Sequence, residues 1–579
     1  MNRKRTPFLE PAAERLPGLS RWRGLDTAGR CSDVLAGLIT AALLVPQGMA
    51  YAALAGLPAE MGLYSALLPL LVYAMFGTSR VIAMGPMALT ALLVGETLRG
   101  QGIHSSQFPA WAGTLALLVG AWLLLLYALR LGRLIDFVSP AVMQGFTAAS
   151  ALMIVISQLA GLLDLAGGEG NFFRQAAALL AQWASLSLTP VLFGTAALVM
   201  LVMIKHWLAP LLRMLGLPAS VASIAGRCGP LLLLVAALVL VAWMDLPLAR
   251  VGTLPAGLPG LTLPALDLDA LGALAAPALG IALINYVSAI SVAQTLAARQ
   301  RERLYTQREL WVLGLCNLCA ALSRGFPVTS GLGRAVVNLE AGSRTPLSSL
   351  FAAIALAAVL LFAAGIFAPL PKAVLAAVVI QAAWPLLDLR PLRRTWRYSR
   401  ADGAAWLGAF AGVLVFGVME GLAIGVGIAL ALLLTRASRP YIDEVGRLPQ
   451  GGFRNPARYP VEIPPHLLMV RPGADLNFAN MGALERFINA HLADRDGVSD
   501  LVLVMSGVLY IDGAALEALA QLDQRLEGQG VTLWLAELRA PVRDQLSATP
   551  FLASHRERVF FSTEDAWRRL AMREEDFSI

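Results

Sequence analysis

Long apolar runs alternate with short polar stretches over most of the chain, and this pattern predicts membrane-spanning helices. A helix needs about 20 apolar residues to cross a bilayer, and runs near that length recur from residue 33 to residue 434. A stretch rich in proline and leucine, residues 245–268, divides them into two sets. The expected segments are 33–55, 63–76, 87–98, 110–129, 139–163, 189–207 and 229–243 in the first set, and 270–298, 309–322, a short helix from Arg334, 346–367, 373–386, 404–419 and 422–434 in the second.

The third segment of each set is unusually short and follows a break rich in glycine and proline. Residues 77–86 read Gly-Thr-Ser-Arg-Val-Ile-Ala-Met-Gly-Pro, and residues 325–331 read Gly-Phe-Pro-Val-Thr-Ser-Gly. Interrupted segments at matching positions of two halves point to the binding site of a transporter. About seven segments per half, an odd number, make the halves inverted repeats and place both chain ends on one side of the membrane.

Arg334 follows the second break directly and stands among long apolar runs. A charged residue at membrane depth is costly, which suggests a function. Irregular backbone is tolerated there only where it is buried in protein or lines a wet cavity. The start of a helix adds free N–H groups and the positive end of a dipole. The sequence therefore predicts half of an anion-binding site at this break.

The composition supports the membrane interpretation. Of the 579 residues 57% are hydrophobic and 14% charged, and the mean hydropathy is +0.67, whereas soluble chains carry about 25% charged residues. Residues 1–32 are basic and have no apolar core, so we expect a cytoplasmic amino-terminal segment rather than a cleavable signal peptide. A transmembrane transport domain is expected over residues 33–440.

Residues 441–579 have the character of a soluble domain. They hold 14 arginines and 20 acidic residues, a net charge of −6, whereas the preceding residues hold 31 basic and 18 acidic ones, a net charge of +13. Apolar runs at 467–471, 500–505 and 531–536 predict strands, and residues 480–493 and 513–526 predict helices. Strands alternating with helices indicate a small α/β domain, which we expect in the cytoplasm with its linker.

The basic excess gathers in loops around residues 130–133, 299–308, 390–400 and 436–439. Positive loops mark the cytoplasmic side of a membrane protein, and this explains the excess better than binding to nucleic acid. Glu420, between two apolar segments, is best explained by a tight turn at the outer surface rather than by proton coupling.

The sequence contains no residue pattern typical of an enzyme. Cys316 and Cys319 share one face of an apolar helix, where packing explains them better than zinc or redox chemistry. The five histidines are scattered, and no Ser/His/Asp, HExxH or P-loop pattern occurs. We therefore expect no enzyme, no cofactor and no metal site.

Several ordered motifs resemble the sulfate permease (SulP) family of anion transporters with a carboxy-terminal STAS domain. The resemblance covers residues 33–570 and departs from the family signature at Met61, where an aromatic residue is usual. The motifs are Val45-Pro-Gln-Gly-Met-Ala-Tyr51, Ala59-Glu-Met-Gly-Leu-Tyr-Ser-Ala66 with Val72-Tyr73 and Gly77-Thr-Ser-Arg80, Phe326-Pro-Val-Thr329, Arg334-Ala-Val-Val-Asn338 and Ala341-Gly-Ser-Arg-Thr-Pro346.

This resemblance implies an α-helical polytopic membrane protein of the uracil-permease type. Its 14 or so segments would form two inverted seven-segment repeats divided into a core and a gate, followed by a small cytoplasmic α/β STAS domain. The substrate would lie between the facing amino ends of the third and tenth segments. The residues expected there are Gln47, Tyr51, Met87, Ala88, Gly331, Leu332, Gly333 and Arg334.

Two departures from the family pattern bear on mechanism. Many relatives place an acidic residue on the eighth segment, where Ser288 stands here, and no acidic residue occurs between Asp269 and Glu302. We include Ser288 among the expected substrate-site residues, but a hydroxyl cannot replace a carboxylate as partner of a coupling cation. In the STAS domain, Ala514 occupies the position of a phosphorylatable serine, which argues against a phosphoswitch.

We therefore expect a secondary transporter of the inner membrane that moves a small inorganic anion, sulfate by family default, by alternating access. Both termini would be cytoplasmic. Bicarbonate, chloride or a dicarboxylate remain alternative substrates, since backbone dipoles select charge better than identity. Rival interpretations are a nucleobase permease and a membrane-anchored STAS regulator with little transport. Expected partners are the anion, membrane lipid, a second copy in a homodimer and a cytoplasmic protein on the STAS domain, but no nucleic acid.

Overall fold

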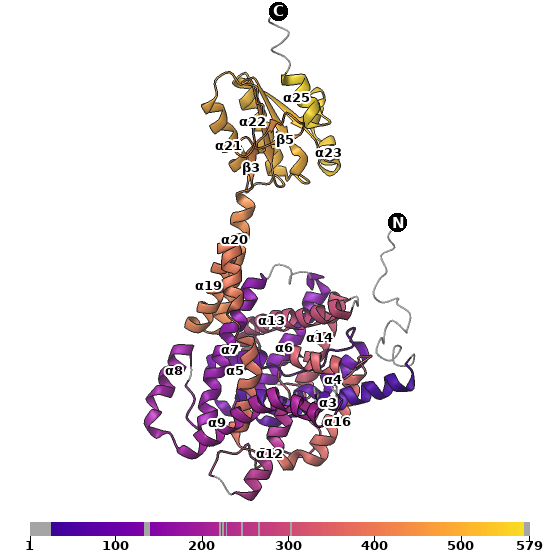
Figure 1. The fold of residues 1–579 in the computed structure, drawn as a ribbon, viewed down its shortest axis with the longest axis vertical. Coiled ribbons are helices and arrows are strands. Elements are labelled where there is room, and N and C mark those ends of the chain that lie inside the picture. Colours follow the sequence, from indigo (N-terminus) through magenta and orange to yellow (C-terminus); the bar gives the residue numbers. More distant parts are fainter. Residues whose placement is uncertain are drawn as a thin grey trace, which may run out of the picture. The chain divides into compact units, whose positions relative to one another are not determined.

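The chain folds into two compact units, residues 1–429 and residues 430–579 (Figure 1). The first consists of helices and the second is built on a β-sheet. The computed structural model describes residues 25–132, 139–168, 170–218, 222, 225–226, 228–244, 247–264, 267–300 and 304–571. The expected amino-terminal segment therefore lies mostly outside the described residues, as do parts of the basic loops at 130–133 and 299–308.

Helices of the first unit form two sets, one before and one after residues 247–264 in the sequence. Nine helices of the described residues are long and apolar enough to cross a membrane, and α12 is a shorter apolar helix. The first set contains α3 (Thr27–Leu54), α4 (Ala59–Phe76), α5 (Ala88–Gly100), α6 (Phe108–Ala128), α7 (Pro140–Leu163), α8 (Phe172–Ala181), α9 (Leu188–Met203) with η5 (Ile204–Leu208) and α10 (Ala209–Met214), and α12 (Gly229–Trp243).

The second set repeats this plan. As in the first, a two-residue strand precedes a short third helix. It contains α13 (Leu268–Gln300), α14 (Thr306–Leu322), α15 (Leu332–Glu340), α16 (Ser348–Ala358) with η6 (Val359–Ala363) and η7 (Ala364–Phe367), α17 (Lys372–Ala383) with η8 (Trp384–Leu386), α18 (Arg390–Tyr398), α19 (Arg400–Phe416) and α20 (Val418–Ser438).

The helices pack in two groups, as expected for a core and a gate. In the core, α14 lies against α4 and α6, α13 lies against α6, and α16 lies against α3 and α4. In the gate, α7 lies against α17 and α19, and α9 lies against α17. The two groups meet where α17 and α12 contact α3. Each group takes helices from both halves of the chain, which is what interlocked inverted repeats require.

The second unit is an α/β sandwich. Its sheet has the order β3-β6-β7-β8-β9, in which β3 is antiparallel to β6 and the other pairs are parallel. The strands are β3 (Ile442–Glu444), β6 (Leu467–Pro472), β7 (Asp500–Val504), β8 (Thr532–Ala536) and β9 (Val559–Phe560), and the longer helices are α21 (Met481–Asp494), α22 (Gly513–Gly528), α23 (Ala540–Ser547) and α25 (Thr563–Ala571).

Successive strand residues point to opposite faces of this sheet, and both faces are covered. Leu501 and Leu503 belong to the cluster beneath α21 and α22, whereas Val502 and Val504 pack with Trp567 of α25. Burial on both faces explains the continuous apolar runs of β7 and β8. The expected strands and helices of this domain are confirmed, while β3, β9 and α25 go beyond the sequence-based expectation.

Several details of the first unit differ from the sequence-based expectation. The segment expected at 189–207 continues through the π-helical η5 to Met214, and α8 and α18 are additional short helices. The turn expected around Glu420 lies at Gly417, whose φ of 121° suits glycine, and Glu420 is in the first turn of α20. The expected domain boundary at residue 440 stays a prediction.

Candidate functional site

The two breaks meet as a short antiparallel ladder. Strand β1 (Met84–Gly85) pairs with β2 (Thr329–Ser330), with Met84 opposite Ser330 and Gly85 opposite Thr329. Backbone groups at membrane depth need partners inside the protein, and each break supplies them to the other. Since β1 leads into α5 and β2 leads into α15, this pairing brings the amino ends of both helices together.

Neither helix has a side-chain cap at its amino end. Met87 is the N-cap of α5 and Gly331 the N-cap of α15, and both lack a side-chain hydrogen bond to the first turn. The first four N–H groups of an α-helix have no partner within the helix. Both helices thus present free N–H donors and the positive ends of their dipoles, each equivalent to roughly half a unit charge.

Arg334 joins the two breaks from inside. Its side chain is 3% exposed. Its Nη1 donates to the carbonyl oxygen of Pro86 at 2.6 Å, and its Nη2 lies 3.5 Å from the carbonyl oxygen of Thr329. The guanidinium thus holds the start of α5 beside the start of α15. It also keeps its full charge near both helix ends, because neutral carbonyl oxygens do not cancel it.

Two buried amides replace the missing backbone pairing around the second break. Asn317 of α14 accepts from the Val328 N–H at 2.9 Å and donates to the Val328 carbonyl oxygen at 3.0 Å. Asn285 of α13 also donates to that oxygen, at 3.3 Å, and accepts from the Thr90 hydroxyl at 2.6 Å. Each buried amide satisfies polar groups that would otherwise be costly, so α13 and α14 fix the position of the loop.

A buried carboxylate pairs with the backbone of the first break in a similar way. Glu309 of α14 is 3% exposed and accepts from the N–H groups of Thr78 and Ser79 at 2.9 and 3.3 Å. It also accepts from the hydroxyls of Thr78 and Tyr73. Asn338 of α15 donates to the Val81 carbonyl oxygen at 3.0 Å. The motif residues therefore hold the backbone of the breaks in place.

A cavity of about 530 Å³ lies in front of the two helix ends. Its core wall comes from α3, α5 and α15, and its other wall from η5, α10, α12, α17 and η8. The polar side chains on it are Gln47, Tyr51, Lys205, Gln381 and Arg334, and no acidic residue is among the described residues that line it. A cavity with two cations and two sets of free N–H groups favours an anion.

Eight of the nine residues expected in the site line this cavity: Gln47, Tyr51, Met87, Ala88, Gly331, Leu332, Gly333 and Arg334. Their role in binding stays a prediction. Ser288, the ninth, is half-buried on α13 and is not among the lining residues. Helix α13 reaches the breaks through Asn285, one turn earlier, and its hydrogen bonds are to backbone and to Thr90.

Sequence reasoning missed Lys205 and Gln381. Both line the same cavity as Arg334 and come from gate helices, η5 and α17. A lysine inside the apolar run Leu188–Met214 was a usable signal, because intramembrane charges usually face a cavity. Gln381 gave no comparable signal, since a lone amide in an apolar helix is as compatible with packing.

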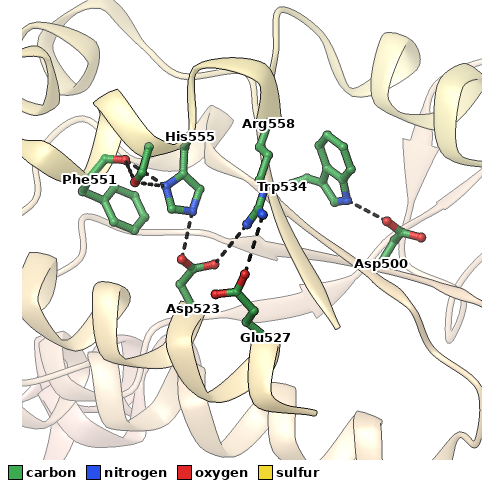
Figure 2. A network of polar contacts seen from close by, with 8 residues as sticks. Asp500, Asp523, Glu527, Trp534, Phe551, His555 and Arg558 are labelled. Atoms are coloured by element: carbon green, nitrogen blue, oxygen red, sulfur yellow. Dashed lines mark hydrogen bonds and ion pairs between the residues drawn. The ribbon is translucent and has the colours of Figure 1, made fainter. Parts of the chain in front are cut away.

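The STAS unit contains a polar network that outwardly resembles a catalytic triad (Figure 2). His555 lies 3.1 Å from a carboxylate oxygen of Asp523 and 3.0 Å from the Ser554 hydroxyl. That hydroxyl donates to the Phe551 carbonyl oxygen at 2.9 Å, however, and the Nδ1 of His555 lies 2.8 Å from the same oxygen. The network ties α24 (Pro550–Ser554) to α22, which is a structural role. The described residues contain no cluster able to hold a metal ion.

Comparison with known proteins agrees with this architecture. The sequence profile of the sulfate permease family matches residues 31–409, and that of the STAS domain matches residues 458–566. A probable sulfate transporter of Mycobacterium tuberculosis is 34% identical over 556 residues, which cover 94% of this chain and 96% of the relative. Probable sulfate transporter 4.2 of Arabidopsis thaliana is 34% identical over 518 residues, 86% of this chain and 75% of the relative.

Among solved structures, the murine anion transporter Slc26a9 in its inward-facing state superimposes with a TM-score of 0.89. The match covers 98% of this chain and 96% of that one at 23% identity, so it supports the fold. The paired breaks, the core and gate helices, the STAS sheet and the profile over more than half of the chain lead to one conclusion. The chain is a multi-pass membrane protein that belongs to the sulfate permease family of anion transporters.

Proposed function

We propose that the protein is a secondary transporter that carries sulfate across the inner membrane by alternating access. One observation carries the proposal. The uncapped amino ends of α5 and α15, together with Arg334, face a single cavity whose described lining has no acidic side chain. The core would carry both helix ends past the gate, exposing the same donors first to one side of the membrane and then to the other.

The proposed substrate is a doubly charged oxyanion for two reasons. Two relatives that match 94% and 86% of this chain are named as probable sulfate transporters. Arg334 and Lys205, which both line the cavity, provide two positive charges for one dianion. N–H groups from two helices and the Gln47 amide can donate to several oxygens of a tetrahedral ion at once. Bicarbonate, chloride and dicarboxylates have fewer acceptors or a different shape and are the alternatives to be tested.

The proposed transport is exchange or uncoupled flux rather than symport with Na⁺ or H⁺. A coupling cation needs an acidic or oxygen-rich partner. Ser288 provides no carboxylate on α13, and the buried Glu309 already accepts from three donors of the first break and from the Tyr73 hydroxyl of α4. The described residues that line the cavity include no acid, which also argues against a nucleobase, whose ring N–H groups need acceptors.

The proposed topology places both termini and the STAS domain in the cytoplasm. The basic loops support this orientation. We further propose that two copies form a homodimer and that the STAS domain binds a cytoplasmic protein. A phosphoswitch is not proposed for this domain, because Ala514 in the first turn of α22 has no hydroxyl.

Uptake of radiolabelled sulfate, bicarbonate, chloride and fumarate into proteoliposomes tests the function. The decisive variant is Gly333→Val, because an added Cβ at Gly333 meets no atom within 4 Å and enters the cavity. We expect a loss of sulfate uptake of about tenfold or more from steric exclusion, with unchanged thermal stability.

The matched control is Gly272→Val on α13, where an added Cβ also meets no atom within 4 Å and which does not line the cavity. This variant should transport like the wild type.

A chain truncated after Pro440 separates transport from regulation by the STAS domain. Wild-type sulfate uptake by Gly333→Val would contradict the assignment of the site, and no uptake of any anion by the wild type would favour the regulator interpretation.

A further inference from the structure

Helix α18 (Arg390–Tyr398) carries a face made of arginine. Its sequence is Arg-Pro-Leu-Arg-Arg-Thr-Trp-Arg-Tyr, so Arg390, Arg393, Arg394 and Arg397 stand at positions i, i+3, i+4 and i+7. Residues at this spacing lie on one side of an α-helix. A surface cavity of about 510 Å³ is lined by these four residues and Tyr398. We call this set of five residues the arginine face.

The opposite side of α18 is fixed to the gate. Leu392 packs against a cluster of Ala141, Ala148 and Trp406 from α7 and α19. Trp396 lies so close to Gly403 of α19 that a Cβ added there would come within 2.4 Å of the indole ring. The helix therefore cannot turn its arginines inward, and the arginine face stays directed away from the protein.

Charge on the arginine face is almost uncompensated. Asp388 accepts from Arg390 at 2.9 and 3.3 Å. No ion pair joins Arg393, Arg394 or Arg397 to an acidic residue in the part of the chain that the structure describes. Like charges four residues apart destabilise a helix, so the helix alone gains nothing from this arrangement. A bound anion would turn the repulsion into attraction.

The surroundings of the arginine face indicate where this anion comes from. Helix α18 lies at the end of the candidate span Lys372–Tyr398. Leu389 is 52% exposed, and the aromatic residues Trp384 and Trp396 are 63% and 43% exposed. Tryptophan and tyrosine are enriched at the level of lipid head groups. A basic helix flanked by exposed aromatic residues at the end of a span fits the surface of a membrane.

We propose that the arginine face binds the phosphate group of an anionic phospholipid. Guanidinium groups pair with phosphate oxygens through two parallel hydrogen bonds, and four of them can surround a phosphate diester. In the proposed topology α18 is cytoplasmic, where acidic lipids attract basic juxtamembrane segments. Pro385 and Leu386, just before α18, line the anion cavity, so the lipid would anchor the gate beside the transport site.

The test measures thermal stabilisation of the full-length protein in detergent by short-chain phosphatidylglycerol, phosphatidylcholine and inorganic phosphate. Phosphatidylglycerol should raise the melting temperature in a saturable manner, less so at high salt. In the triple variant Arg393→Gln/Arg394→Gln/Arg397→Gln, we expect half-saturation at a lipid concentration about tenfold higher, since three charge-assisted contacts are lost.

The matched control, Arg486→Gln/Arg543→Gln/Arg556→Gln, removes the same charge from exposed positions of the STAS unit and should respond like the wild type. An unchanged response in the α18 variant, or equal stabilisation by phosphatidylcholine, would overturn the proposal. If inorganic phosphate stabilises the protein as much as phosphatidylglycerol does, the bound phosphate group need not belong to a lipid, and the proposal of a lipid ligand is overturned. Should the triple variant fail to fold, Arg394→Gln alone should still shift half-saturation, and no shift would overturn the proposal.

The readout is independent of transport. Gly333→Val, chosen to block the anion cavity, should keep its response to phosphatidylglycerol. Failure of the lipid proposal and failure of the proposed transport function therefore give different results.

Discussion

At the scale of single residues, the contacts of Arg334 bear on two different tasks, holding the breaks together and attracting an anion. Arg334 is expected from the sequence to attract an anion, but a buried arginine can also hold a break by pairing with a carbonyl group. Its bonds to Pro86 and Thr329 are of the second kind, and its position on the cavity wall is compatible with the first. Replacement of Arg334 would thus disturb fold and function together. Lys205 is the better probe of charge, because it is exposed and lies on the gate.

Lys205→Gln should weaken apparent sulfate affinity by roughly fivefold, the effect of removing one charge a few ångströms away in a wet site. The maximal rate should change less, because the donors on α5 and α15 remain. Titration of sulfate uptake in proteoliposomes measures both quantities. Arg213→Gln on α10, which is exposed and does not line the cavity, is the control. Equal effects of the two variants would show that Lys205 acts only through overall charge.

A second prediction at this scale concerns pH and the STAS unit. Arg447 donates to Glu564 at 2.9 and 3.2 Å, and these hydrogen bonds hold the pKa of the Glu564 carboxyl below its usual value. A carboxyl with a lowered pKa in the folded state stabilises the fold above its unfolded pKa, about 4.3, and this contribution is lost as the pH falls through the folded pKa.

Glu564→Gln should therefore destabilise the STAS unit slightly at neutral pH, by less than about 1 kcal/mol because the pair is partly exposed. The difference from the wild type should vanish in acid. Urea denaturation, with hydrogen exchange of the α25 amides as the readout, measures this difference in stability. The control Glu557→Gln, at an exposed position, should be as stable as the wild type at every pH. If Glu564→Gln stays less stable than the wild type in acid, the ionised pair is not the cause of the difference.

At the scale of elements, the helix starts depend on groups far away in sequence. Strands β1 and β2 are two residues long, too short to be stable alone. Buried side chains supply the hydrogen bonds that longer strands would provide, because they pair with backbone donors and acceptors of the breaks. These side chains are Asn317, Asn285 and Glu309. The short helices α5 and α15 are thus positioned by α13 and α14 as much as by their own sequences.

Asn317→Leu should therefore destabilise the membrane unit and reduce sulfate uptake. It leaves the N–H group of Val328 without its partner, at a cost of about 1–3 kcal/mol for an unsatisfied buried group, whereas the carbonyl oxygen keeps its hydrogen bond from Asn285. Thermal unfolding of the purified protein and uptake assays check both effects. Ser288→Ala on α13 is the control and should change stability by no more than about 0.5 kcal/mol. A stable and active Asn317→Leu variant would mean that the break is held without the amide.

At the scale of the whole molecule, two inverted halves share each structural layer. The core takes α3, α4 and α6 from one half and α13, α14 and α16 from the other, so the cavity in front of α5 and α15 can form only when both halves are folded. The gate contributes Lys205 and Gln381 to the same cavity. Movement of core against gate would change the distance between the two cations and thereby the affinity for an anion.

The prediction at this scale is that sulfate transport persists when Na⁺ is replaced by a large organic cation and no pH gradient is applied. The described lining of the cavity offers no carboxylate to a coupling ion. Uptake into proteoliposomes with defined internal and external solutions measures it, with internal sulfate present or absent to separate exchange from uncoupled flux. Strict dependence on either cation would contradict the proposal and direct attention to buried acids such as Glu309 and Asp33.

The sequence predicted much of this architecture because its strongest signals are local. Apolar runs of spanning length mark the helices, and Met84-Gly-Pro86 and Gly331 mark the starts of α5 and α15 to within a residue or two. Eight cavity residues followed from motifs near those breaks. Ser288 does not line the cavity and its role in binding stays a prediction, since on a long helix a small shift in alignment does not tell which turn faces the loop. Asn285, one turn earlier, takes that place.

What the amino-acid sequence determined by itself is most of the elements: which segments are apolar enough to leave water, where glycine and proline interrupt them, and that an α/β domain follows them. These properties depend on neighbouring residues and on solvent. The tertiary structure alone decided which distant groups meet. Glu309 reaches Thr78 across 231 positions of the chain, and Lys205 faces the same cavity as Arg334. Such pairings depend on how helices pack, and no local pattern encodes them.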